Sequence, residues 1–101
     1  MAKSAPRFAS ASYRLDHFHR HGAGVHAISP RQYEIAAARF FSGPPVAGVH
    51  EKTRSNGDVI RYNEHTEEFG VLRPNGGIRT FFRPDPAEHG YRSNLEYFNA
   101  Q

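Results

Sequence analysis

Three histidines lie within five residues near the N-terminus, in the segment Asp16-His17-Phe18-His19-Arg20-His21. On a helix, His17 and His21 would be one turn apart on the same side. Imidazole titrates near neutral pH, so these side chains suit general acid or base catalysis. The spacing also occurs in HxxxH metal sites, but a zincin motif needs Glu where Phe18 stands, and no convincing third ligand follows. Solvated surface histidines are the simpler alternative.

A second group of candidate residues flanks Asn56-Gly57, a strong signal for a two-residue hairpin turn. With that turn, Lys52 would pair with Arg61, and one hairpin face would carry His50, Lys52, Arg54 and Arg61. Like charges directly opposite each other destabilise a sheet, so the pattern favours an anionic ligand, such as a phosphate backbone, on this face. Solvent together with the flanking acids Glu51 and Asp58 is the alternative compensation.

These residue types fit RNA cleavage, because the substrate's own 2′-hydroxyl is the nucleophile. A base takes its proton, an acid protonates the leaving 5′-oxygen, and cations or hydroxyls stabilise the phosphorane, leaving a 2′,3′-cyclic phosphate. His21 or His17 can move the protons, and we favour His21 as the base because it is closer to the helix end. The stabilising groups would be Arg54, Arg61 and Thr80. Thr80 lies in a segment where strand propensity alone also favours a β-branched residue.

The composition predicts one small domain without thiol chemistry. The chain has 101 residues, of which 38% are hydrophobic and 13% aromatic, so we expect a thin core rich in phenylalanine. Cysteine is absent, which excludes disulfides and cysteine-based zinc sites. No apolar segment has the length of a membrane span. The net charge of +3 suggests a polyanionic ligand. We expect no metal and no cofactor.

Two helices are predicted in the N-terminal half, after a flexible lead-in over residues 1–11. The first spans about 12–21, with Ser10 or Ser12 as N-cap and Gly22 as its stop. The second begins at Ser29-Pro30, where Gln32 completes a capping box. Its apolar stripe, which should face the core, consists of Tyr33, Ala36, Ala37, Phe40 and Phe41.

The C-terminal half predicts four short strands at 46–54, 58–63, 68–73 and 78–83, followed by a capped turn at Ser93 and Glu96. The expected fold is therefore α+β, with two N-terminal helices packed on a four-stranded antiparallel sheet in a single domain over 1–101. The residues expected to be prominent in its core are Phe40, Phe41, Ile60, Phe69, Val71 and Phe81.

Four segments carry a resemblance to known proteins: "LDHFHRHG", "RSNGDVIRYN", "EFGVL" and "IRTFFRPDPAEHGYRSNLEYFNAQ". Together they resemble C-terminal toxin domains of bacterial polymorphic and contact-dependent inhibition toxins, over residues 13–101 and most specifically from Arg54 onward. The resemblance implies the barnase/EndoU/colicin/RelE-like fold and metal-independent cleavage of RNA, commonly tRNA. It also implies export as part of a larger toxin, action in the cytoplasm of a target bacterium, and a cognate immunity protein that blocks the site.

The resemblance also implies site residues. A helix-borne histidine, basic residues on the first strands and a Ser or Thr on a later strand correspond here to His17 and His21, Arg54, Arg61 and Thr80. His89 matches a recurring His-Gly pair, while the extra His19 departs from the pattern. The RNA contacts would come from His50, Lys52, Arg79, His89 and Tyr97.

Two alternatives from other classes remain. Aromatic and cationic residues interleave around Tyr62 and over residues 79–83, as in modules that bind nucleic acid without cleaving it. A RelE-like domain that has lost activity and only binds protein is the second. For an active toxin, we expect acidic residues of the immunity protein to dock on the cationic hairpin face.

Overall fold

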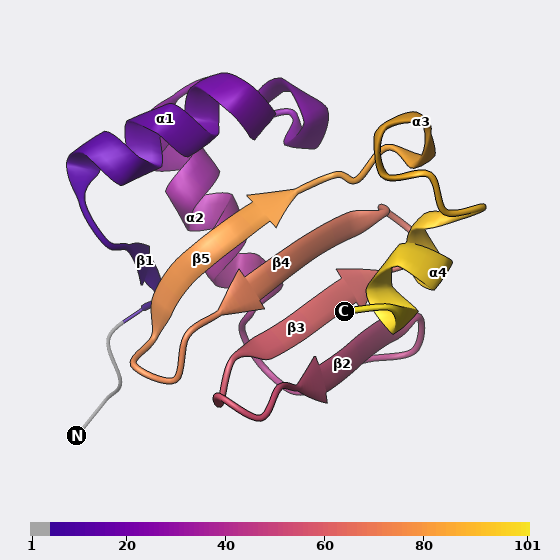
Figure 1. Ribbon diagram of the computed structural model, residues 1–101. Coiled ribbons are helices and arrows are strands. Elements are labelled where there is room, and N and C mark those ends of the chain that lie inside the picture. The colour runs from indigo at the N-terminus through magenta and orange to yellow at the C-terminus, as the bar shows by residue number, and fades with distance from the viewer. Residues whose placement is uncertain (1–4) are drawn as a thin grey trace.

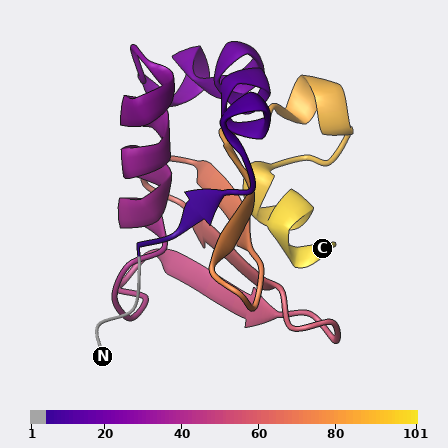
Figure 2. The same ribbon diagram turned by 90° about the vertical axis from the view of Figure 1, so that its left-hand side faces the viewer.

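The computed structural model, which describes residues 5–101, has one sheet of five strands in the order β1-β5-β4-β3-β2 (Figure 1). Helix α2 lies on one face of the sheet and α4 on the other (Figure 2). In chain order the elements are β1 (Arg7–Phe8), α1 (Ala11–His21), the 3₁₀ turn η1 (Ala23–Val25), α2 (Pro30–Phe40), β2 (Val49–Thr53), β3 (Val59–Asn63), β4 (Glu68–Leu72), β5 (Gly77–Phe82), α3 (Pro86–His89) and α4 (Asn94–Asn99).

The predicted antiparallel meander is confirmed for β2 to β5. The prediction was incomplete in two respects, because β1 makes the sheet mixed and the described chain has four α-helices in place of two. β1 lies inside the expected lead-in, of which residues 1–4 fall outside the described part. It pairs in parallel with β5, and Phe8 is 6% exposed. The sequence could not predict β1, because a strand of two residues is too short to show alternation and its partner strand, with Ile78, is far away in sequence.

The predicted helix starts are correct. Ser29 accepts the N–H of Gln32 at the start of α2, and Ser93 accepts that of Glu96 at the start of α4. In a capping box, the side chain three residues after the cap would accept the backbone N–H of the cap residue itself. Here the Gln32 amide oxygen instead accepts the N–H of Ile28, one residue before the cap. Each cap satisfies backbone donors that the first helical turn leaves unpaired.

The first hairpin has a three-residue loop, so the predicted strand register was wrong by one residue. The N–H of Arg54 donates to the Asp58 carbonyl, and Gly57, at φ +93°, occupies the left-handed position that a loop of this length needs. A one-residue shift turns a side chain to the other face. Lys52 consequently pairs with Ile60, whereas Arg61 pairs with Glu51. The predicted like-charge pair does not form.

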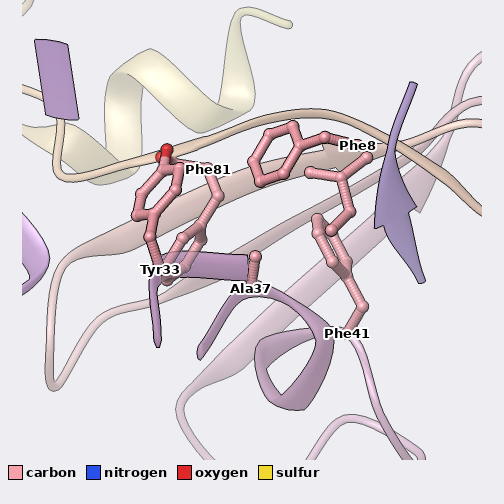
Figure 3. Packing of buried hydrophobic residues seen from close by; sticks show 6 residues of the cluster. Phe8, Tyr33, Ala37, Phe41 and Phe81 are labelled. Carbon is pink, nitrogen blue, oxygen red and sulfur yellow. The ribbon is translucent and has the colours of Figure 1, made fainter. Parts of the chain in front are cut away.

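The core has two layers, one on each face of the sheet. The face that α2 covers, called the α2 face, holds Phe8, Tyr33, Ala37, Phe41, Ile78 and Phe81 (Figure 3). The opposite face, called the α4 face, holds Ile60, Tyr62, Phe69, Val71 and Phe98. Of the residues predicted for the core, five are buried, and Phe40 is half-buried against the α2-face cluster.

A β-bulge interrupts β5. Val71 pairs with Thr80 and Leu72 pairs with Ile78, which leaves Arg79 as the extra residue. Ile78 and Phe81 both belong to the α2-face core. The two residues between them, Arg79 and Thr80, therefore both project toward the α4 face, where a regular strand would have placed only one.

Helix α1 runs beside β5, where β1 no longer covers the strand (Figure 1). The Tyr13 hydroxyl donates to the Arg79 carbonyl at 2.6 Å, and the Tyr33 hydroxyl donates to that of Phe81. These two alternate carbonyls are on the outer edge of β5, and the tyrosines satisfy them. The bulge is thereby held next to α1.

Candidate functional site

Helix α1 presents the two predicted histidines toward β5. His17 is buried, at 6% exposure, and its Nδ1 donates to the Tyr13 carbonyl at 3.1 Å, so its Nε2 is the unprotonated nitrogen in the neutral ring. His21 is half-buried, and its ring centroid lies 5.0 Å from that of Phe82 on β5. The centroids of the His17 and His21 rings are 5.9 Å apart. Of the pair, His21 is the more accessible to a ligand.

Both imidazoles are held in the neutral form. Burial lowers the pKa of His17 below 6.5, although its backbone hydrogen bond acts in the opposite direction. Burial also lowers the pKa of His21, and the nearby Arg20 charge lowers it further. A neutral imidazole at neutral pH can accept a proton, which is what a general base must do.

The bulge turns the predicted Thr80 to the α4 face, on which Phe82 contacts His21. Thr80 and Phe82 alternate on the α4 face, so they are roughly 7 Å apart along the strand, and His21 packs on Phe82. The Thr80 hydroxyl has no hydrogen-bond partner within residues 5–101, and the residue is half-buried. It is thus a free donor two residues along β5 from Phe82, the residue that the neutral His21 contacts.

Arg54 and Arg79 are joined by one buried carboxylate. Asp58 is 2% exposed; Arg79 Nε donates to it at 3.0 Å, and Arg54 Nη1 lies 3.9 Å away. Burial raises the Asp58 pKa, but hydrogen bonds from Arg79 and Asn56, together with the charges of Arg79 and Arg54, lower it by more, so the group is ionised. The two guanidinium side chains are 35% and 41% exposed, and both retain donors for a ligand. The sequence pattern indicates Asp58 only as an acid flanking the cationic hairpin, and does not predict that it joins the two arginines.

Arg61 does not join this group. It projects to the α2 face, is 6% exposed, and forms an ion pair with Glu51. Its remaining donors reach the carbonyls of Phe40, Ser42 and Gly43, at the C-terminal end of α2. Arg61 therefore caps α2 and has no donor left for a substrate.

His89 and Tyr97 lie at the other end of the α4 face. Their rings stack at 4.5 Å, and the ring of Tyr97 lies 6.5 Å from that of Phe82. The Nδ1 of His89 accepts the N–H of Tyr91 while its Nε2 donates to Asn94, so both nitrogens serve the loop between α3 and α4. Burial raises the pKa of Tyr97, which keeps its hydroxyl protonated.

His50 and Lys52 are on the α4 face of the edge strand β2. His50 Nε2 lies 2.7 Å from Glu64, an exposed contact. The Lys52 ammonium donates to the Asn99 carbonyl and sits 4.8 Å above the Phe98 ring. With Arg61 on the opposite face, the predicted hairpin cluster is reduced to His50, Lys52 and Arg54.

Within 5–101, no three His, Cys, Asp or Glu side chains gather closely enough to hold a metal ion. No helix in that range has the length and apolarity needed to cross a membrane.

Neither a known protein-family model nor any curated protein matches this chain. The α4 face of the sheet offers a neutral imidazole in contact with Phe82, the hydroxyl of Thr80, and two half-exposed guanidinium groups joined by Asp58. These groups can accept a proton and stabilise an anion.

Proposed function

We propose that the chain is a metal-independent endoribonuclease, a toxin domain that cleaves RNA such as tRNA on the α4 face beside β5. The observation that carries the proposal is the bulge, because it turns both Arg79 and Thr80 to the face on which Phe82 contacts His21, and Arg79 is joined there through Asp58 to Arg54. This combination supplies a base and charge-stabilising donors without Arg61.

The proposed reaction assigns a role to each group. Neutral His21 accepts the 2′-hydroxyl proton as the 2′-oxygen forms its bond to phosphorus. The bond from phosphorus to the 5′-oxygen breaks, and that oxygen takes a proton from a water molecule, which is restored by the proton that the imidazolium of His21 releases. Arg79, Arg54 and the Thr80 hydroxyl stabilise the additional negative charge on the phosphorane. The products are a 2′,3′-cyclic phosphate and a 5′-hydroxyl.

The proposal extends to the biological setting that the sequence resemblance implies. The domain would be delivered as part of a larger exported toxin and act in the cytoplasm of a target bacterium. A cognate immunity protein would cover the α4 face, with acidic residues near Lys52 and Arg54.

A cleavage assay with defined end groups tests the reaction. The purified chain should cut tRNA in the presence of EDTA, and the new 5′ ends should accept phosphate from polynucleotide kinase without prior dephosphorylation. Fragments with 5′-phosphates, or cleavage that EDTA abolishes, would contradict the mechanism. Binding without any cleavage would favour the nucleic-acid-binding alternative.

Substituting histidines on α1 tests the base. His21→Ala should slow cleavage about 10²–10⁴-fold, the usual contribution of a general base. His19→Ala is the matched control, since His19 is an exposed histidine of the same helix, and it should retain the parent rate. Folding is checked by circular dichroism before each assay. Equal rates for the two variants would remove His21 from the mechanism.

A further inference from the structure

Arginines gather on the α4 face at the end of the sheet where both hairpin turns lie. The backbone bonds that close the turns pair Arg54 with Asp58 and Arg73 with Gly77, and β1 pairs Arg7 with Gly77. The two hairpins stand side by side through β3 and β4. These residues thus form one level across all five strands, which we call the arginine row: Arg7, Arg54, Asp58, Arg73 and Gly77, with Arg79 added by the bulge.

Strand alternation puts the whole arginine row on the α4 face. Its neighbouring level includes Leu72, Ile78 and Phe8, which pack in the α2-face core. Side chains one residue further along each strand must point the other way. The hydrogen bonds between Arg79 and Asp58 agree with this placement.

The row concentrates the positive charge of the protein. Four arginines and one aspartate give it a net charge of +3, which equals the formal net charge of the entire chain. Adjacent strands are about 4.8 Å apart, so Arg54, Arg73 and Arg7, on every second strand, are spaced roughly 10 Å apart. Asp58 occupies the gap between Arg54 and Arg73, but Arg79 already neutralises it.

Two of these arginines have no evident structural task. The side chains of Arg7 and Arg73 make no hydrogen bond or ion pair with residues 5–101, in contrast to Arg61 on the α2 face. Arg7 is exposed and Arg73 half-exposed. Placing like charges on one level of a sheet without partners destabilises the fold, which an anionic ligand would offset.

We propose that the arginine row binds the phosphate backbone of an RNA strand that crosses the sheet, beside the cleavage site. Regularly spaced guanidinium groups on an open face suit a chain of phosphates, and each can make two parallel hydrogen bonds to one phosphate. The proposal rests on the proposed function for the identity of the ligand. It adds that the substrate is held over several nucleotides, and it assigns this task to Arg7 and Arg73, which the sequence did not single out.

A binding measurement that needs no cleavage tests the arginine row. The full chain is titrated with a single-stranded 2′-O-methyl RNA, which cannot be cleaved through its 2′-oxygen, at a series of salt concentrations. The variant R7Q/R73Q should bind more weakly, and the slope of log K against log salt should fall in magnitude by about 1.4, or about 0.7 per lost phosphate contact on a single strand. The thermal unfolding temperature should be no lower than that of the parent, because two like charges without partners have been removed.

The matched control is R31Q/R39Q, which removes the same charge from exposed positions of α2. It should leave the slope close to that of the parent. An equal fall in slope for both variants would show that only net charge matters and would overturn the proposal. So would unchanged RNA affinity in R7Q/R73Q, the result expected if the row instead binds an acidic protein.

The outcomes separate this proposal from the proposed function. If R7Q/R73Q weakens binding but the parent chain cuts no RNA, the arginine row stands and the nuclease assignment fails. If the parent cuts RNA but R7Q/R73Q binds RNA as tightly as the parent, the proposal that the arginine row binds RNA is wrong and the nuclease assignment is retained.

Discussion

Arg61 and Arg79 each follow an isoleucine in a strand of the same sheet, yet they have opposite tasks. Arg61 faces α2, where Glu51 and three carbonyls at the end of that helix occupy its donors. Arg79 faces the α4 side, bonded to Asp58 and 41% exposed. The same dipeptide thus gives a buried helix cap in β3 and a candidate ligand-binding cation in β5.

The difference shows that the partners of an arginine decide its task more than its neighbours in sequence do. A guanidinium whose five donors are all used holds structure together. One that keeps donors near solvent can still bind an anion. We therefore expect substitutions on the α2 face to change stability and substitutions on the α4 face to change cleavage.

The largest effect is expected from substituting Arg61, which should change stability without changing cleavage. Arg61→Met should lower the free energy of unfolding by about 3 kcal/mol, because it leaves Glu51 and several carbonyls without a partner. Cleavage per folded molecule should remain at the parent rate. Urea denaturation measures the first quantity, and an assay corrected for the folded fraction measures the second.

The counterpart on the α4 face is Arg79→Met combined with Asp58→Asn, which avoids leaving a buried carboxylate unpaired. This double variant should lose cleavage and retain more stability than Arg61→Met. The comparison would break down if Arg61→Met, although folded, no longer cleaved RNA.

A smaller effect should follow from Thr80→Val, which removes the hydroxyl and preserves the β-branched shape. Cleavage should slow by about 10²-fold, the lower end of the usual loss when one charge-stabilising donor is removed. Stability should stay within about 0.5 kcal/mol of the parent. Thr53→Val, on the α2 face of β2, is the control and should change neither quantity. If Thr80→Val cleaves RNA at the parent rate, Thr80 has no part in catalysis and its residue type reflects only the preference of strands for β-branched side chains.

The smallest effect concerns pH. Because folding lowers the pKa of His17 and of His21, the unfolded chain binds more protons, and stability should fall as the pH drops below the ordinary histidine value of 6.5. His17→Phe should flatten this dependence between about pH 7.5 and about pH 5, whereas His19→Phe should not. Denaturant midpoints at the two pH values give the measurement. An unchanged pH dependence in His17→Phe would contradict the assigned cause.

Local signals in the sequence determined much of the fold. Ser29-Pro30 marked the start of α2, the apolar stripe marked its buried face, and alternation together with the Asn56-Gly57 turn marked the strands β2 to β5. The spacing of His17 and His21 placed both on one side of a helix. Such features depend on residues within about one turn or one hairpin, where propensity and periodicity act.

Only the tertiary structure decided which side chains share a face. One additional loop residue before Asp58 turned Arg61 away from the site, and one additional residue in β5 turned Arg79 toward it. Because side chains alternate with a period of two residues, a count that is wrong by one reverses every assignment beyond it. β1 and the arginine row depend in addition on pairing between distant segments, which leaves no pattern in either segment alone.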